Sequence, residues 1–168
     1  MLEFGGENEE IREKAPTAPW LVSLTDTEDN RLRIVIALAM EGEEGEGLEE
    51  ISEAQRTKAD EMLARSRPVY MDTTRAYEIV FDRYVMYQTR NESYTVWDKY
   101  EIRRGNYLIL FERSRLLDYA ESVLFDFDDE ETKRGRRHYG VYTEDHIIDI
   151  ITNHPPAIRK IDLPRKPD

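Results

Sequence analysis

The histidines of the chain gather in its last third, close to two aspartates: His138, His146, His154, Asp145 and Asp149. Two imidazoles and a carboxylate form a ligand set that holds zinc or iron with an open position for water. If residues 138–142 and 146–151 form a hairpin, however, pairing across its loop places His138 opposite about residue 150 and away from His146. The spacing therefore predicts no metal site, and we interpret the histidines as surface or strand residues.

Other patterns that support chemistry are incomplete. The run from Asp126 begins like a calcium-binding loop, but Glu131 stands where glycine is required and Arg137 where glutamate is required. Neither Ser93 nor Ser114 lies in a Gly-x-Ser-x-Gly turn, and the glycines at 42–47 lie among glutamates that repel phosphate. We therefore predict no catalytic residue and no cofactor, and we expect a protein that is not an enzyme.

The middle of the chain is rich in tyrosine and interleaved with arginine. Tyrosine, tryptophan and arginine anchor many protein interfaces because each combines a large contact area with a polar group. The alternative is that these aromatic residues divide between the core and the outer face of a sheet, as aromatic residues in strands often do. Six residues of this region are our candidate binding residues: Tyr84, Tyr87, Tyr94, Trp97, Arg90 and Glu92.

Charge limits the classes of partner. The 36 acidic residues outnumber the 24 basic ones and give a net charge of −12. Such a protein repels nucleic acid and anionic membrane surfaces at long range, so we expect neither as a partner. A basic protein is the partner that this charge favours, although acidity also serves solubility alone. The sequence gives no indication of oligomeric state.

Composition also indicates the compartment. The chain has no cysteine, so it forms no disulfide and no thiolate metal site. Its longest apolar run, Ile34 to Met40, is far shorter than the ~20 residues that span a bilayer. Its first residues lack a basic region followed by an apolar stretch. We expect a cytoplasmic protein.

Local patterns predict a mixture of strands and helices. Ser52 and Gln55 fit a capping box at the start of a helix over 53–65, and Ser114 precedes an apolar stripe that predicts a helix over 114–124. Alternating and β-branched segments predict strands. The residues Arg104-Gly105-Asn106 predict a tight turn between strands over 94–103 and 107–111. The segment 143–152 fits either a helix or a strand, and we favour a strand because of its isoleucines.

These elements predict the α+β class, with one mainly antiparallel sheet built from hairpins and two helices on one face. We expect a single domain over 18–162, flanked by a loosely ordered segment at 1–17 and a tail at 163–168.

In overall character, though in no motif, the chain resembles small acidic immunity proteins that neutralise toxins. Our leading hypothesis is a non-enzymatic acidic domain that binds a basic protein partner and neutralises or adapts it. The alternative is a small-ligand-binding protein or an enzyme with a pocket between the sheet and the helix at 114–124, with His138, His146 or Glu92 as candidate residues.

Overall fold

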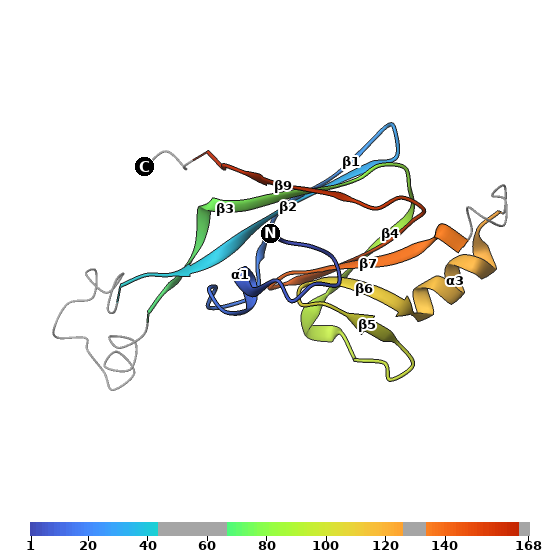
Figure 1. The fold of residues 1–168 in the computed structure, drawn as a ribbon, viewed down its shortest axis with the longest axis horizontal. Coiled ribbons are helices and arrows are strands. Elements are labelled where there is room, and N and C mark those ends of the chain that lie inside the picture. The colour runs from blue at the N-terminus through green and yellow to red at the C-terminus, as the bar shows by residue number, and fades with distance from the viewer. Residues whose placement is uncertain (44–66, 126–133, 165–168) are drawn as a thin grey trace.

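The computed structural model of the protein describes residues 1–43, 67–125 and 134–164, and these form two antiparallel sheets. One sheet has the strand order β1-β2-β3-β9, and its strands are Trp20–Thr27, Arg31–Glu41, Val69–Phe81 and Ala157–Ile161. The other has the order β4-β8-β7-β6-β5, and its strands are, in that order, Tyr84–Asn91, His146–Thr152, Arg137–Tyr142, Leu108–Arg113 and Ile102–Arg104. Figure 1 shows the two sheets as two layers.

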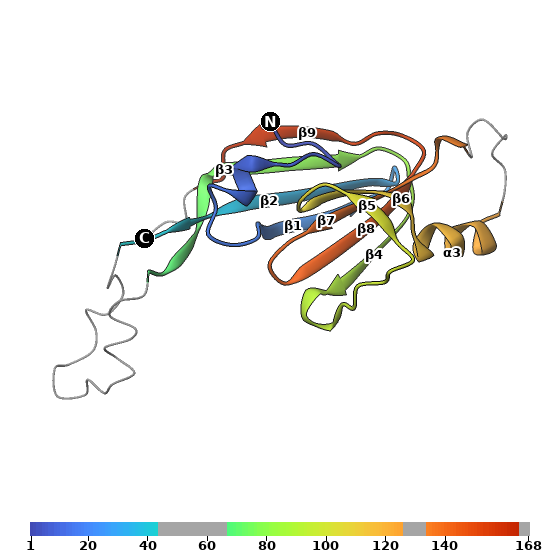
Figure 2. The same cartoon turned by 60° about the horizontal axis from the view of Figure 1, so that its bottom comes forward.

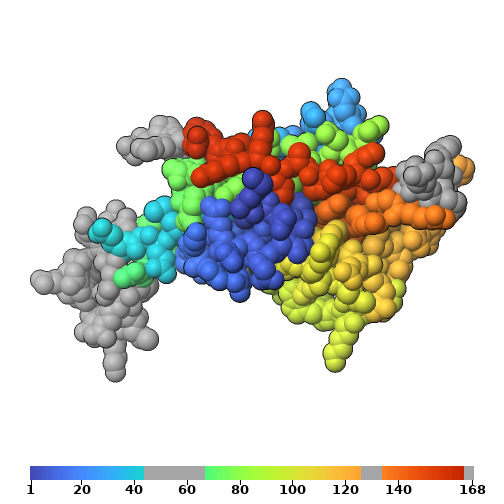
Figure 3. All heavy atoms as spheres, viewed as in Figure 1, coloured from blue at the N-terminus to red at the C-terminus, as the bar shows by residue number. Residues whose placement is uncertain are grey.

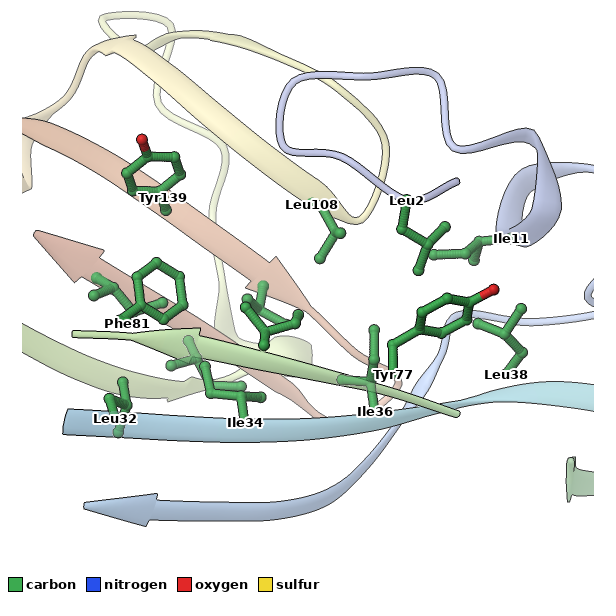
Figure 4. Close-up of a cluster of buried hydrophobic side chains, with 14 residues drawn as sticks. Leu2, Ile11, Leu32, Ile34, Ile36, Leu38, Tyr77, Phe81, Leu108 and Tyr139 are labelled. Atoms are coloured by element: carbon green, nitrogen blue, oxygen red, sulfur yellow. The ribbon is translucent and has the colours of Figure 1, made fainter. Parts of the chain in front are cut away.

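The large core lies between the two sheets, because alternate side chains of the central strands point toward the opposite layer. Strand β2 contributes Leu32, Ile34, Ile36 and Leu38, and β3 contributes Tyr77, Ile79 and Phe81. Figure 4 shows Tyr77 and Phe81 of β3 on the side of that strand that faces Leu108 and Tyr139 of the other sheet. The alternation within β2 therefore determines which of its faces is buried against the second layer.

Strand β8 is buried on both of its faces. Ile148 and Ile150 belong to the core between the sheets, whereas Ile151 belongs to a smaller cluster with Leu116 and Ala120. Those two residues lie on helix α3, Arg115–Val123, which follows β6 and lies at one end of the five-stranded sheet (Figure 2). This double burial explains why β8 reads as a run of isoleucines and not as an alternating strand.

The first twelve residues close one side of the sandwich. Leu2 and Ile11, the latter in the short helix α1 (Glu9–Arg12), are buried in the core between the sheets (Figure 4). The segment binds the turn between β5 and β6, where the Gly5 amide donates to the Leu108 carbonyl. Gly105 in that turn has φ +98°, and a Cβ there would lie 2.7 Å from the Cα of Gly5. Glycine at 105 is thus required both by the backbone conformation and by the close contact.

Several sequence predictions are confirmed. Antiparallel pairing is correct, α3 begins after Ser114 as predicted, and β8 covers residues 146–152 of the ambiguous segment at 143–152. The turn at 104–106 joins β5 to β6, but residues 95–101 form a loop and not a strand, because η2 (Glu92–Tyr94) interrupts the chain there.

The prediction of a single sheet is wrong. The chain passes from β3 to β4 through Asp82 and Arg83, which has φ +53°, and that turn carries β4 into the second layer. The fold is therefore mainly β, with helices as minor elements. The predicted helix at 53–65 lies outside the described residues.

No helix in the described ranges has both the length and the apolar character needed to cross a membrane.

Candidate binding site

A hollow of about 360 Å³ lies on the outer face of the five-stranded sheet, between that sheet, helix α3 and the loop at 95–101. The sheet contributes residues of β4, β7 and β8, and the helix and loop contribute the remaining walls. The residues that line it are Gln88, Arg90, Val96, Asp98, Glu101, Arg115, Leu116, Tyr119, His138 and Asp149. Three separate parts of the chain therefore form one hollow, which brings charged and apolar side chains together.

A buried polar network forms its floor. His138 Nε2 lies 3.1 Å from Asp149 Oδ1, and His138 Nδ1 lies 2.8 Å from the hydroxyl of Ser114. All three side chains are buried. Because the Asp149 carboxylate can only accept, Nε2 carries the proton, and in the neutral imidazole Nδ1 accepts from the Ser114 hydroxyl. The ring also stacks on Phe111, with centroids 3.8 Å apart.

Asp149 is the centre of this network. Its second oxygen, Oδ2, accepts from Gln88 Nε2 and from Arg90 Nε, both at 3.0 Å. Burial alone would raise the pKa of Asp149, but the hydrogen bonds of His138 and Gln88 and the charge of Arg90 outweigh burial and hold that pKa below its usual value. The carboxylate is thus kept ionised although it is buried.

The order Ser114–His138–Asp149 is that of a nucleophilic triad, but the geometry is that of a structural network. The Ser114 hydroxyl is buried and does not line the hollow. It also accepts the amide of Leu117 at 3.1 Å, as the N-cap of α3. A nucleophile must reach its substrate, whereas Ser114 joins the start of a helix to the sheet.

Two arginines stand beside the network, and each is held through one nitrogen. Arg90 Nε contacts Asp149 as described, and Arg115 Nε donates to Asp98 Oδ2 at 2.9 Å. The Arg115 guanidinium also lies over the Tyr100 ring, 4.0 Å from its centroid. Within the described residues, no hydrogen bond engages the terminal nitrogens of either arginine.

The segment at 91–101, which we call the binding loop, is braced at several points. Asn91 caps η2 by accepting the Ser93 amide, and the Glu92 amide donates to the Asp145 carbonyl. Trp97 stacks on Tyr142, while Arg103 lies 3.7 Å above its ring. These contacts hold the loop against the sheet and so reduce the entropy that it would lose on binding.

The same loop exposes apolar side chains. Tyr94 and Val96 are each 86% exposed, and Trp97 is 54% exposed. In Figure 3 the yellow-green atoms of this part of the chain project from the lower edge of the molecule. Apolar groups that are exposed on an otherwise braced loop are typical of interaction sites.

The six predicted binding residues lie in three places. Tyr84 and Tyr87 form an edge-to-face pair that packs on the core between the sheets, and Arg90 lies in the hollow. Tyr94 and Trp97 lie on the binding loop with Glu92, which lines a second hollow beside Trp97.

The sequence pattern groups His138 and Asp149 only as possible metal ligands and gives no connection between them and Ser114. A signal was present, because a histidine and an aspartate at inward positions of apolar strands must be paired when buried. Within the described ranges, no three histidine or acidic side chains are placed to hold a metal ion.

Compared with known proteins, the chain matches no family model, no curated protein and no solved structure.

Proposed function

We propose that this protein is a non-enzymatic binding domain that recognises a protein partner through its binding loop. The observation that carries the proposal is the exposure of Tyr94, Val96 and Trp97 on a braced loop. The exposed area of these side chains contributes nothing to the buried core, whereas a rigid aromatic anchor lowers the cost of association. The loop thus combines exposure with preorganisation.

Charge favours a basic partner. Two segments, 44–66 and 126–133, contribute twelve acidic and four basic residues to a chain of net charge −12. The electrostatic field of a negatively charged protein raises the rate at which it meets a positively charged partner, and salt screens this attraction. A domain of this kind would neutralise or adapt a basic protein.

The test is affinity capture from the native cell extract at low and high salt, with the wild-type protein and a Tyr94→Ser, Val96→Ser variant. We expect a stoichiometric partner that is bound by the wild type, lost by the variant and weakened by salt. The matched control is Tyr70→Ser, which removes a partly exposed tyrosine from β3 and should bind normally. Equal capture by all three proteins, or no capture, would contradict the proposal.

A second candidate function, small-ligand binding in the hollow beside α3, is supported by a different observation. The hollow has a floor of buried, fully hydrogen-bonded polar side chains, and it brings charged and apolar groups together. Convergent polar groups in a concave site are typical of ligand pockets.

A further inference from the structure

The hollow beside α3 contains side chains of both charges. Its cations are Arg90 and Arg115, and its anions are Asp98, Glu101 and Asp149. Two of the anions already neutralise the two arginines, at 2.9 and 3.0 Å. The formal balance of the lining is therefore one negative charge, which belongs to Glu101.

The arginines present hydrogen-bond donors that the protein leaves unused. Asp149 and Asp98 each hold their arginine by Nε, so the four terminal N–H groups of each guanidinium make no hydrogen bond within the described residues. A guanidinium fixed in this way is preorganised for a carboxylate, whose two oxygens match its planar fork. The donor set of the hollow thus favours a carboxylate group.

Glu101 presents the complementary acceptor. Asp149 accepts three hydrogen bonds, and Asp98 accepts the Tyr100 amide and Arg115. The Glu101 carboxylate, by contrast, makes no hydrogen bond or ion pair with any part of the chain that the structure describes. An ammonium group is the natural partner of such a carboxylate.

Charge balance excludes simpler ligands. A plain anion would enter a hollow of net negative charge on a protein of charge −12, and a plain cation would leave the guanidinium donors unused. A zwitterion satisfies both sets at no net charge. Its uncharged part would meet the apolar wall formed by Val96, Leu116 and Tyr119.

We propose that the hollow binds a small zwitterion of the α-amino-acid class, an inference that rests on the second candidate function. The carboxylate of the ligand accepts from the terminal nitrogens of Arg90 and Arg115, and its ammonium group donates to Glu101. The buried network of His138 and Asp149 keeps Arg90 oriented beneath it.

Calorimetric titration of the whole protein with the free amino acids, their N-acetyl derivatives and their amides tests this proposal. We expect at least one free amino acid to bind, and each blocked derivative to bind about tenfold more weakly, because one charge-assisted contact is lost. Glu101→Gln should weaken the free amino acid and leave the N-acetyl derivative unchanged. Arg115→Gln should weaken both.

The control variant is Arg31→Gln, which removes an exposed ion pair with Asp82 on the other sheet and should not change binding. Circular dichroism of every variant checks the fold. If amino acids fail but a simple carboxylate or amine binds in a manner that Arg115→Gln weakens, the zwitterion is wrong and the second candidate function stands. If no member of the three classes binds, both are wrong.

Discussion

Each sheet carries one buried carboxylate in an inner strand, and the two differ in what surrounds them. Asp149 in β8 accepts from His138, Gln88 and Arg90 beneath α3 and the binding loop. Glu78 in β3 is equally buried, but its partners are Arg33 and Arg159, which are 41% and 72% exposed. Asp149 accepts from one arginine, one histidine and one amide, whereas both donors to Glu78 are arginines that reach water.

The two carboxylates are alike in burial and ionisation and differ in the elements that lie over them. Burial and ionisation are shared, since the pKa of each carboxyl is lowered: for Glu78 chiefly by its hydrogen bond with Arg159, and for Asp149 by donors that outweigh its burial. Only Asp149 has a helix and a loop above it. The helix and the loop form two walls of the hollow around Asp149, whereas the hollow of about 590 Å³ around Glu78 is lined only by strands of the four-stranded sheet and by Asp82.

The largest expected effect is that of Asp149→Ala. It leaves the buried Nε2–H of His138 and the Arg90 guanidinium without their acceptor, so we expect the free energy of unfolding to fall by about 3 kcal/mol. Urea denaturation measures this change. A loss below about 1 kcal/mol would mean that water enters the network and replaces the carboxylate.

Ser114→Ala should cost less, about 2 kcal/mol. It removes the N-cap of α3 and leaves Nδ1 of His138 without a donor. Ser114→Thr, which keeps the hydroxyl, is the matched control and should restore most of the loss in the same denaturation experiment. Equal losses in both variants would show that the side-chain volume and not the hydroxyl matters.

Glu78→Ala should cost about 1 kcal/mol, because Arg33 and Arg159 remain solvated after their partner is removed. The comparison of the two carboxylates predicts this ranking. A cost equal to that of Asp149→Ala would mean that the helix and the loop over Asp149 make no difference to the stability that a buried carboxylate contributes.

The smallest expected effect is the dependence of the stability of the protein on pH. Both carboxyl groups have a lower pKa in the folded protein than in the unfolded chain, so each contributes stability above its unfolded pKa and loses that contribution as pH falls through the folded one. The unfolding midpoint should therefore decrease in acid below pH ~4. Glu78→Gln and Asp149→Asn should each flatten this decrease, and thermal scans from pH 2 to pH 7 measure it.

Local patterns predicted local structure well. The Ser114 cap and the apolar stripe after it determine α3, and Gly105 determines the turn between β5 and β6. The two layers were not predicted, because they depend on pairs far apart in sequence, such as Tyr87 with Ile150 and Ile79 with Ile158. Such pairings are set by tertiary packing and leave no local signal.

The site was partly predictable for the same reason. The aromatic and arginine content of the middle segment pointed to Tyr94 and Trp97, which the structure places at the surface. The network could not be found in this way, since Ser114, His138 and Asp149 belong to three elements that meet only after the five-stranded sheet has formed. Whether these three side chains meet depends on how the strands pair, and the spacing of the residues along the sequence does not reveal that pairing.

The closure of the sandwich by the first twelve residues has a kinetic consequence. Asn8 donates to the carbonyl of Asn106, 98 positions later, so the segment at 1–12 has no docking place until the β5–β6 hairpin exists. Contacts of such separation require a costly loop closure before they contribute stability. We therefore expect slow refolding, over milliseconds to seconds in stopped-flow experiments, with Leu2 and Ile11 among the last side chains to leave water.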